Sequence, residues 1–115
     1  MSSSSYFSVR TLDQGDKLSR ETILRHARVK IHYTGRFDNG KVFDATGEDP
    51  IKFCVGAGQV ILGLDEGVLG LKKVQKAIIT CPPDYAYGSA GAPGIIPPDA
   101  TLHFEIQVIE FQQFL

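Results

Sequence analysis

The sequence lacks an excess of charge of either sign. Its 115 residues carry 12 basic and 13 acidic side chains, which leaves a formal net charge of −1. Proteins that bind nucleic acids normally present a basic excess, so this balance argues against such a partner. No apolar run approaches the length needed to cross a bilayer. Met1 and the serines Ser2–Ser5 resemble neither a signal peptide nor a myristoylation site. We therefore expect a cytoplasmic protein with no membrane contact.

Cysteine is also scarce. Cys54 and Cys81 are the only two, each lies among apolar residues of a predicted strand, and there is no Cys-x-x-Cys. We expect two buried free thiols, because a disulfide needs an oxidising compartment. No pair of histidines has helical spacing, so we expect no metal site and no cofactor. Neither cysteine has the cationic surroundings that produce a reactive thiolate, which argues against a Cys–His hydrolase.

The glycine pattern argues against phosphoryl transfer. The glycines at positions 56, 58, 63 and 67 do not form a phosphate-binding loop, since none opens a helix after a parallel strand with the required lysine. Asp44 has no second carboxylate nearby in the sequence with which to share acid and base roles, so a hydrogen-bond acceptor is the better interpretation. Hydrolysis and phosphoryl transfer both lack the necessary side chains.

The apolar residues, 43% of the chain, recur mostly at the two-residue period of half-buried strands. We expect residues 1–6 to form a disordered Ser-rich tail and residues 7–115 to form one domain. The predicted strands are Tyr6–Leu12 (weak), Val29–Thr34, Lys41–Phe43, Ile51–Val55, Val74–Cys81 and Thr101–Phe111. The segment Ser19–His26 is compatible with either a short helical turn or an extended edge, and the sequence does not decide between them.

Only one segment has the period of a helix. Ile61, Leu64, Val68 and Leu71 recur at three- and four-residue steps and predict one apolar stripe. A helix this short needs tertiary packing to persist. Asn39-Gly40 predicts a tight hairpin turn with positive φ at both residues. The expected fold is α+β, with a twisted antiparallel sheet of about five strands around one short amphipathic helix.

The loop after the fifth predicted strand is the most informative segment. Asp84–Gly88 contains two tyrosines, and Gly94–Pro98 contains the adjacent Ile95 and Ile96. Apolar β-branched residues are unusual in a Pro/Gly loop, so we expect this loop to fold back over an apolar surface. The remaining aromatic and aliphatic residues are compatible either with a binding site or with an ordinary core.

Taken together, six strings of residues resemble the FKBP family of peptidyl-prolyl isomerases, the macrolide-binding immunophilins. The strings are Val29–Gly35, Gly40–Asp44, Gln59–Gly63, Asp65–Val68, Asp84–Gly88 and Gly94–Leu102. They occur in the family's order and cover about residues 29–111. The family fold is an antiparallel sheet wrapped over a short helix, which agrees with the fold expected from the residue pattern.

The resemblance implies a peptidyl-prolyl cis-trans isomerase that acts on X-Pro bonds without a cofactor or a covalent intermediate. It implies catalytic roles for Tyr33, Phe43, Asp44, Tyr87 and Phe104, and substrate or macrolide binding by Ile51, Phe53, Val60, Ile61, Leu64, Ile95 and Ile96. The implied partners are X-Pro peptides and protein clients, tacrolimus- or rapamycin-type ligands, and calcineurin in the drug-bound state. A monomer is expected.

The chain departs from the family pattern at the expected floor of the site. Leu64 stands where typical members have Trp, which offers a larger and flatter surface. This departure leaves an alternative open, a weakly active or inactive module that binds Pro-containing segments in the manner of a chaperone. The Asp44–Pro50 loop is also shorter than usual, Ala92 stands where His is frequent, and Val74 replaces a Gly expected at a turn.

Overall fold

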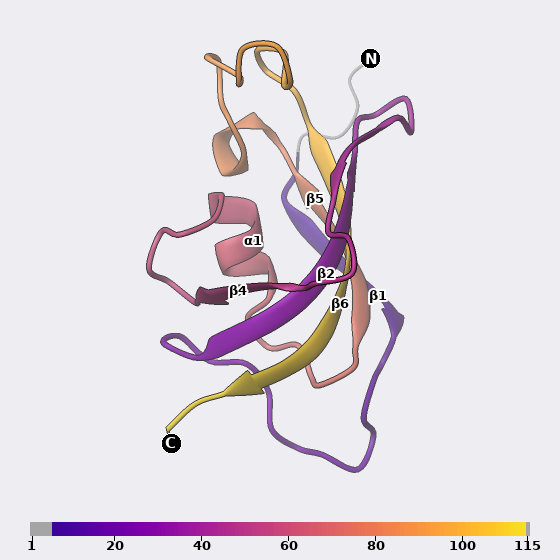
Figure 1. Cartoon of the computed structure of the whole chain (residues 1–115), viewed down its shortest axis with the longest axis vertical. Coiled ribbons are helices and arrows are strands. Elements are labelled where there is room, and N and C mark those ends of the chain that lie inside the picture. Colours follow the sequence, from indigo (N-terminus) through magenta and orange to yellow (C-terminus); the bar gives the residue numbers. More distant parts are fainter. Residues whose placement is uncertain (1–5, 115) are drawn as a thin grey trace.

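One antiparallel sheet curves around a short helix in the computed structural model, which describes residues 6–114 (Figure 1). The elements are β1 (Ser8–Asp13), β2 (Arg28–Arg36), β3 (Val42–Ala45), β4 (Ile51–Cys54), α1 (Leu62–Gly67), β5 (Lys76–Cys81), a 3-10 turn (Pro83–Tyr85) and β6 (Leu102–Gln112). The expected tail lies outside the described residues, apart from the exposed Tyr6. No helix within residues 6–114 is long and apolar enough to cross a membrane.

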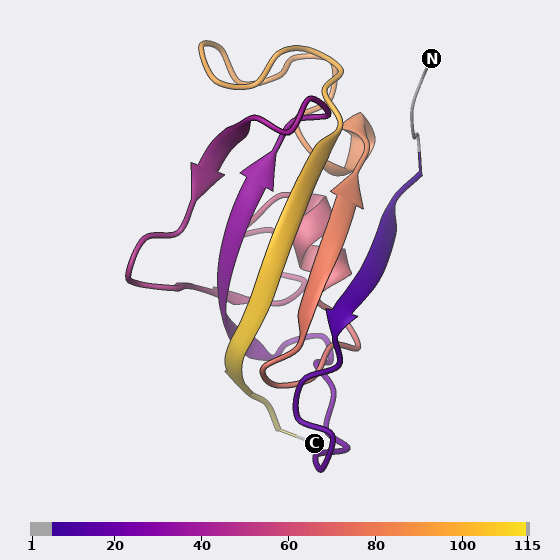
Figure 2. The ribbon, with the colours of Figure 1, turned by 90° about the vertical axis from the view of Figure 1, so that its right-hand side faces the viewer.

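The strand order is β1-β5-β6-β2-β3, and Figure 2 shows the strands side by side with α1 behind them. All pairings are antiparallel, and β4 also pairs with β2. Both edges of β2 are therefore used. One edge runs along β6, while the other pairs with β4 through Arg28–Ile31 and with β3 through Thr34–Arg36. The α+β architecture is confirmed, with six strands rather than about five.

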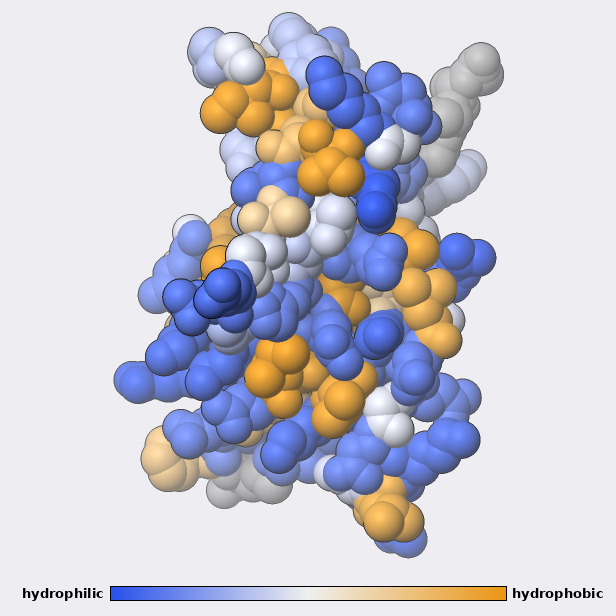
Figure 3. All heavy atoms as spheres, turned by 45° about the vertical axis from the view of Figure 1, so that its right-hand side comes forward, coloured by the Kyte–Doolittle hydropathy of each residue, from blue (hydrophilic) through white to orange (hydrophobic). Residues whose placement is uncertain are grey.

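The core fills the space between α1 and the inner face of the sheet. Along β6, Leu102, Phe104, Ile106 and Val108 are buried, as the alternation predicts. The helix glycines permit close packing, because a Cβ on Gly67 would lie 2.5 Å from Cδ1 of Ile79 on β5. Figure 3 views the molecule obliquely from the outer side of the sheet and shows a mostly hydrophilic surface with small, separate hydrophobic spots. In this view the outer side of the sheet therefore offers no large apolar surface, whereas the buried apolar residues of β6 lie on the inner face.

Several local predictions are corrected. The hairpin after β2 is not a two-residue turn, since only Gly40 has positive φ (86°) and the turn closes through the Gly40 N–H on the Phe37 carbonyl. A turn followed by a glycine in the left-handed conformation is the usual form of a three-residue hairpin loop. The helix is shorter than its apolar stripe, because Val68 caps it and Leu71 lies beyond its end. The segment Ser19–His26, for which the sequence left a helical turn and an extended edge open, forms neither a helix nor a strand.

Two further corrections concern Val74 and the cysteines. Val74 precedes β5 instead of beginning it and has φ of 66°, a strained conformation for a β-branched residue. Its N–H donates to the Val108 carbonyl at 2.9 Å, so the neighbouring strand holds the backbone in place. Both cysteines are free, but only Cys81 is fully buried, whereas Cys54 is half-buried.

Candidate functional site

Three aromatic rings from three strands meet on the inner face, where β3 pairs with β2. Tyr33 and Phe104 have ring centroids 5.6 Å apart at 68°, and Phe43 and Phe104 have centroids 5.7 Å apart at 85°. These edge-to-face arrangements are favourable aromatic contacts. Phe104 is buried, whereas Tyr33 and Phe43 keep part of their surface accessible. We call Tyr33, Phe43 and Phe104 the aromatic cluster.

Gly35 makes the aromatic cluster possible. It lies between the two neighbouring strands, opposite Phe104 on β6 and Asp44 on β3. A Cβ at this position would lie 2.6 Å from Cζ of Phe43 and 3.0 Å from Cε1 of Phe104. Both rings therefore occupy the volume that any other side chain would need.

A polar pair borders the cluster. The Tyr33 hydroxyl donates to Oδ2 of Asp44 at 2.6 Å, and the Ala45 N–H donates to Oδ1 at 2.9 Å. Burial raises the pKa of Tyr33, and the adjacent Asp44 carboxylate raises it further. The phenol therefore stays protonated at neutral pH and fixes the direction of the carboxylate. Asp44 remains solvent-exposed, so its oxygens are accessible to a ligand at the rim.

The segment before α1 and the helix itself supply aliphatic residues. Leu64 is buried at 4% exposure, and Val60 and Ile61 pack half-buried against the same core. The Ile61 carbonyl accepts the N–H groups of Leu64 and Asp65, each at 3.1 Å. Within residues 6–114 the Ile61 N–H itself donates to no protein acceptor. It is a donor that a bound carbonyl could use.

Strand β4 contributes the two other expected residues of this region. Phe53 is buried at 4% exposure and belongs to the core, while Ile51 is half-buried against it. Phe53 is as buried as Leu64 and Phe104, and Ile51 is the more accessible of the two; the binding roles of both stay predictions.

The loop between β5 and β6 folds back on itself. Ala92 and Ile96 exchange two backbone hydrogen bonds of 2.8 Å, and the Asp99 N–H donates to the Gly88 carbonyl. Ile96 is buried at 5% exposure and packs into the core, as expected for a loop that folds back over an apolar surface. Ile95 is 63% exposed, and its role in ligand binding stays a prediction.

The base of this loop is tied to the N-terminal strand region. Phe7 stacks on Tyr85 with ring centroids 4.4 Å apart. Tyr87, two residues further on, stays 42% exposed at the rim. Within residues 6–114 its hydroxyl makes no hydrogen bond, so a ligand could use it.

Sequence reasoning missed the importance of Asp65. It is one of two buried polar residues in the described chain, and its carboxylate accepts two backbone N–H groups of the preceding loop. The available signal was an acidic residue directly after the buried Leu64, following the glycine-rich segment 56–58. Its contacts depend on how the loop folds back, which no periodicity reveals.

The arrangement suits a particular kind of ligand. The aromatic cluster and the aliphatic residues can enclose a small apolar ring, while the rim offers a carboxylate, a phenol and an unpaired N–H. Apolar surface with a few fixed polar groups is typical of small-molecule and peptide sites.

Comparison with known proteins covers most of the chain. Residues 19–109 match the family described as FKBP-type peptidyl-prolyl cis-trans isomerase. The chain is 47% identical over 87 residues to peptidyl-prolyl cis-trans isomerase Fkbp12 of Drosophila melanogaster, a match covering 74% of this chain and 81% of the relative. It is 42% identical over 106 residues to peptidyl-prolyl cis-trans isomerase FKBP1A of Xenopus laevis, covering 90% and 96%. FK506-binding protein 1 of Rhizopus delemar is 50% identical over 84 residues, covering 71% and 78%.

Proposed function

The chain belongs to the family of FKBP-type peptidyl-prolyl cis-trans isomerases, and on that premise we propose that it isomerises X-Pro bonds at the aromatic cluster. The observation that carries the proposal is the meeting of Tyr33, Phe43 and Phe104 beside the Tyr33–Asp44 hydrogen bond. These residues come from three strands and leave two rings accessible.

The reaction needs no bond to be made or broken. Rotation about a peptide bond has a barrier of about 18–20 kcal/mol because amide resonance must be lost. The two isomers of an X-Pro bond are close in energy and interconvert in roughly 10–100 s without a catalyst. The twisted amide is less charge-separated than the planar one. A water-poor, apolar site therefore stabilises the transition state relative to the planar ground state, which lowers the barrier.

The proposed roles follow from position and exposure. The proline ring packs between Tyr33, Phe43 and Phe104, with Leu64 beneath it. The Ile61 N–H and the Tyr87 hydroxyl donate to carbonyls that flank the proline. The remaining contacts are with Asp44, Ile51, Phe53, Val60, Ile95 and Ile96.

We extend the proposal to ligands. FK506, or tacrolimus, appears in the name of a relative, and we propose that this chain binds tacrolimus- or rapamycin-type macrolides over the same aromatic cluster. Binding of calcineurin by the drug-bound form, and action as a monomer on protein clients, are proposed from the family resemblance alone.

A double variant tests the proposed site. Tyr33→Phe with Phe43→Ala removes the hydrogen bond to Asp44 and one ring of the cluster. We expect kcat/KM to fall at least about tenfold, because losing a buried aromatic contact costs on the order of 1.5 kcal/mol or more. The matched control is Tyr6→Phe with Phe114→Ala, the same chemistry at two exposed positions. Unchanged turnover in a folded Tyr33/Phe43 variant would show that the reaction occurs elsewhere.

A further inference from the structure

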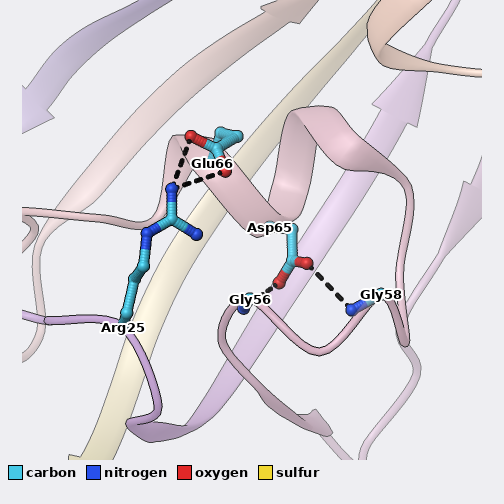
Figure 4. A network of polar contacts seen from close by, with 5 residues as sticks. All are labelled: Arg25, Gly56, Gly58, Asp65 and Glu66. Carbon is cyan, nitrogen blue, oxygen red and sulfur yellow. Dashed lines mark hydrogen bonds and ion pairs between the residues drawn. The ribbon is translucent and has the colours of Figure 1, made fainter.

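Asp65 is a charged side chain enclosed by the fold. It lies in the first turn of α1 and is only 5% exposed. Its Oδ1 accepts the Gly56 N–H at 2.7 Å and its Oδ2 accepts the Gly58 N–H at 3.1 Å (Figure 4). Within residues 6–114 no cation pairs with this carboxylate. A buried carboxylate is tolerated when its oxygens are hydrogen-bonded, and here both oxygens accept from one loop.

The neighbouring carboxylate has a different environment. Glu66 pairs at 3.1 Å with Arg25, and both side chains are partly exposed. Figure 4 shows Glu66 facing Arg25 while Asp65 faces Gly56 and Gly58. Two consecutive acidic residues of α1 therefore have separate tasks, one on the surface and one against the loop.

Within the described residues, the loop that Asp65 holds has few other hydrogen bonds, and one of them joins the Ala57 N–H to the Cys54 carbonyl at 3.3 Å. Gly56 and Gly58 have φ of 88° and 72°, and a Cβ on Gly58 would meet open space. Glycine at positive φ is conformationally free in the absence of other constraints. The other side-chain anchor is Gln59, whose Oε1 accepts the Cys54 N–H at 2.8 Å.

Asp65 is attached to both ends of this segment. Its side chain holds Gly56 and Gly58, and its own backbone N–H donates to the Ile61 carbonyl at 3.1 Å. Between these attachments lie Val60 and the Ile61 N–H, which the proposed function assigns to the substrate site. Because the Asp65 carboxylate holds the loop just before Val60 and Ile61, it restrains the direction in which the Val60 side chain and the Ile61 N–H face.

We propose that Asp65 is a positioning residue of the isomerase site. Its carboxylate keeps residues 56–61 in the conformation that presents Val60 and the Ile61 N–H to the substrate. Asp65 acts through the loop and touches no substrate itself. This role rests on the proposed function.

Loss of such an anchor has a distinctive kinetic signature. When the loop leaves its competent conformation part of the time, apparent substrate affinity falls in proportion to the competent fraction, while saturating substrate restores it. KM therefore rises and kcat changes little. Irreversible loss of folded molecules does the reverse, because it lowers the apparent kcat and leaves KM unchanged. Reversible global unfolding would also raise KM, but it would expose the core strands to hydrogen exchange together with the loop.

Asp65→Asn is the informative change, since it keeps the size of the side chain and replaces one acceptor by a donor that faces an N–H. We expect KM to rise by up to about tenfold, the value reached if the roughly 10- to 100-fold shift of the loop equilibrium on losing a hydrogen bond to a charged acceptor leaves about a tenth of the loops competent. kcat should stay within about twofold. The control Glu66→Gln should change neither, and Asp65→Glu, which restores the charge, should recover most of the wild-type KM.

The experiment combines protease-free steady-state kinetics on an X-Pro-Phe peptide with amide hydrogen exchange by NMR on the free protein. Faster exchange at Gly56 and Gly58 in Asp65→Asn, with protected core strands and a raised KM, supports the role. If Asp65→Asn has the kcat and KM of the unmutated protein, or a lower kcat at the same KM, the role of Asp65 is overturned and the proposed function stands. If the unmutated protein itself shows no turnover, the proposed function is overturned, and the role of Asp65 with it.

Discussion

A single methyl group placed on Gly35 should impair the site more than the fold. Gly35 pairs with Phe104 on β6 and with Asp44 on β3, so neighbouring strands on both sides restrain its backbone. The added Cβ of Gly35→Ala would lie 2.6 Å from Phe43 and 3.0 Å from Phe104. Both distances are below van der Waals contact. The two rings, rather than the strand, must therefore shift.

The expected effects differ in size. Overpacking of this kind costs about 1–3 kcal/mol of stability. Replacing Gly by Ala in a strand returns roughly 0.5–1 kcal/mol through the unfolded chain. The net loss of about 0–2.5 kcal/mol is smaller than the 5–15 kcal/mol that typically holds a domain together. In contrast, a displacement of about 1 Å at a reacting site can cost on the order of a hundredfold in rate.

The assay measures kcat/KM for an X-Pro peptide together with urea unfolding and near-UV circular dichroism. Gly47→Ala is the matched control, because its Cβ meets nothing within 4 Å and its φ is not positive. We expect Gly35→Ala to lose at least about tenfold in kcat/KM while it remains folded, with Gly47→Ala near wild type. Full activity of a folded Gly35→Ala protein would refute the placement of the rings in the site.

Three other predictions concern ionisation, strain and the floor of the site. The pKa of Tyr33 in the folded protein is raised by burial first and by Asp44 second. The protonated phenol therefore contributes stability that is fully present below pH 10.0, the ordinary pKa of tyrosine, and that is lost as the pH rises above this value. Urea unfolding between about pH 9 and 11 should show this decline, and Asp44→Asn should reduce its slope; an identical slope contradicts the assignment. Val74→Gly should raise the free energy of unfolding by about 0–1.5 kcal/mol, since relief of the left-handed strain gains about 1–2 kcal/mol and the greater entropy of glycine in the unfolded chain costs about 0.5–1 kcal/mol. Leu64→Trp should raise kcat/KM in the peptide assay, and a fall in a folded variant would show that this position does not form the floor of the site.

The main features that were predicted from sequence are those with a strict local period. The alternation along β6 and the stripe through Leu64 and Val68 indicated their buried faces, and the six matched strings indicated the family. What failed depended on distant contacts. The positive φ of Val74 is imposed by a hydrogen bond to β6, and the hairpin at Gly40 closes on Phe37 rather than on its own dipeptide.

The site was predictable to a similar extent. Matching to the family named the three residues that the fold brings together in the aromatic cluster. It could not give the exposure of each site residue, such as 4% for Phe53 and 63% for Ile95, because exposure depends on how strands and loops pack. Asp65 escaped notice because its partners are backbone N–H groups, which leave no trace in side-chain patterns.

The central claim is that the aromatic cluster isomerises X-Pro bonds. The most direct test is a protease-free isomerisation assay on an X-Pro-Phe peptide, with and without rapamycin. The account predicts acceleration over the uncatalysed rate that stoichiometric drug abolishes. A folded protein that binds the drug without any turnover would favour a binding module, and turnover unaffected by bound drug would contradict the location of the site.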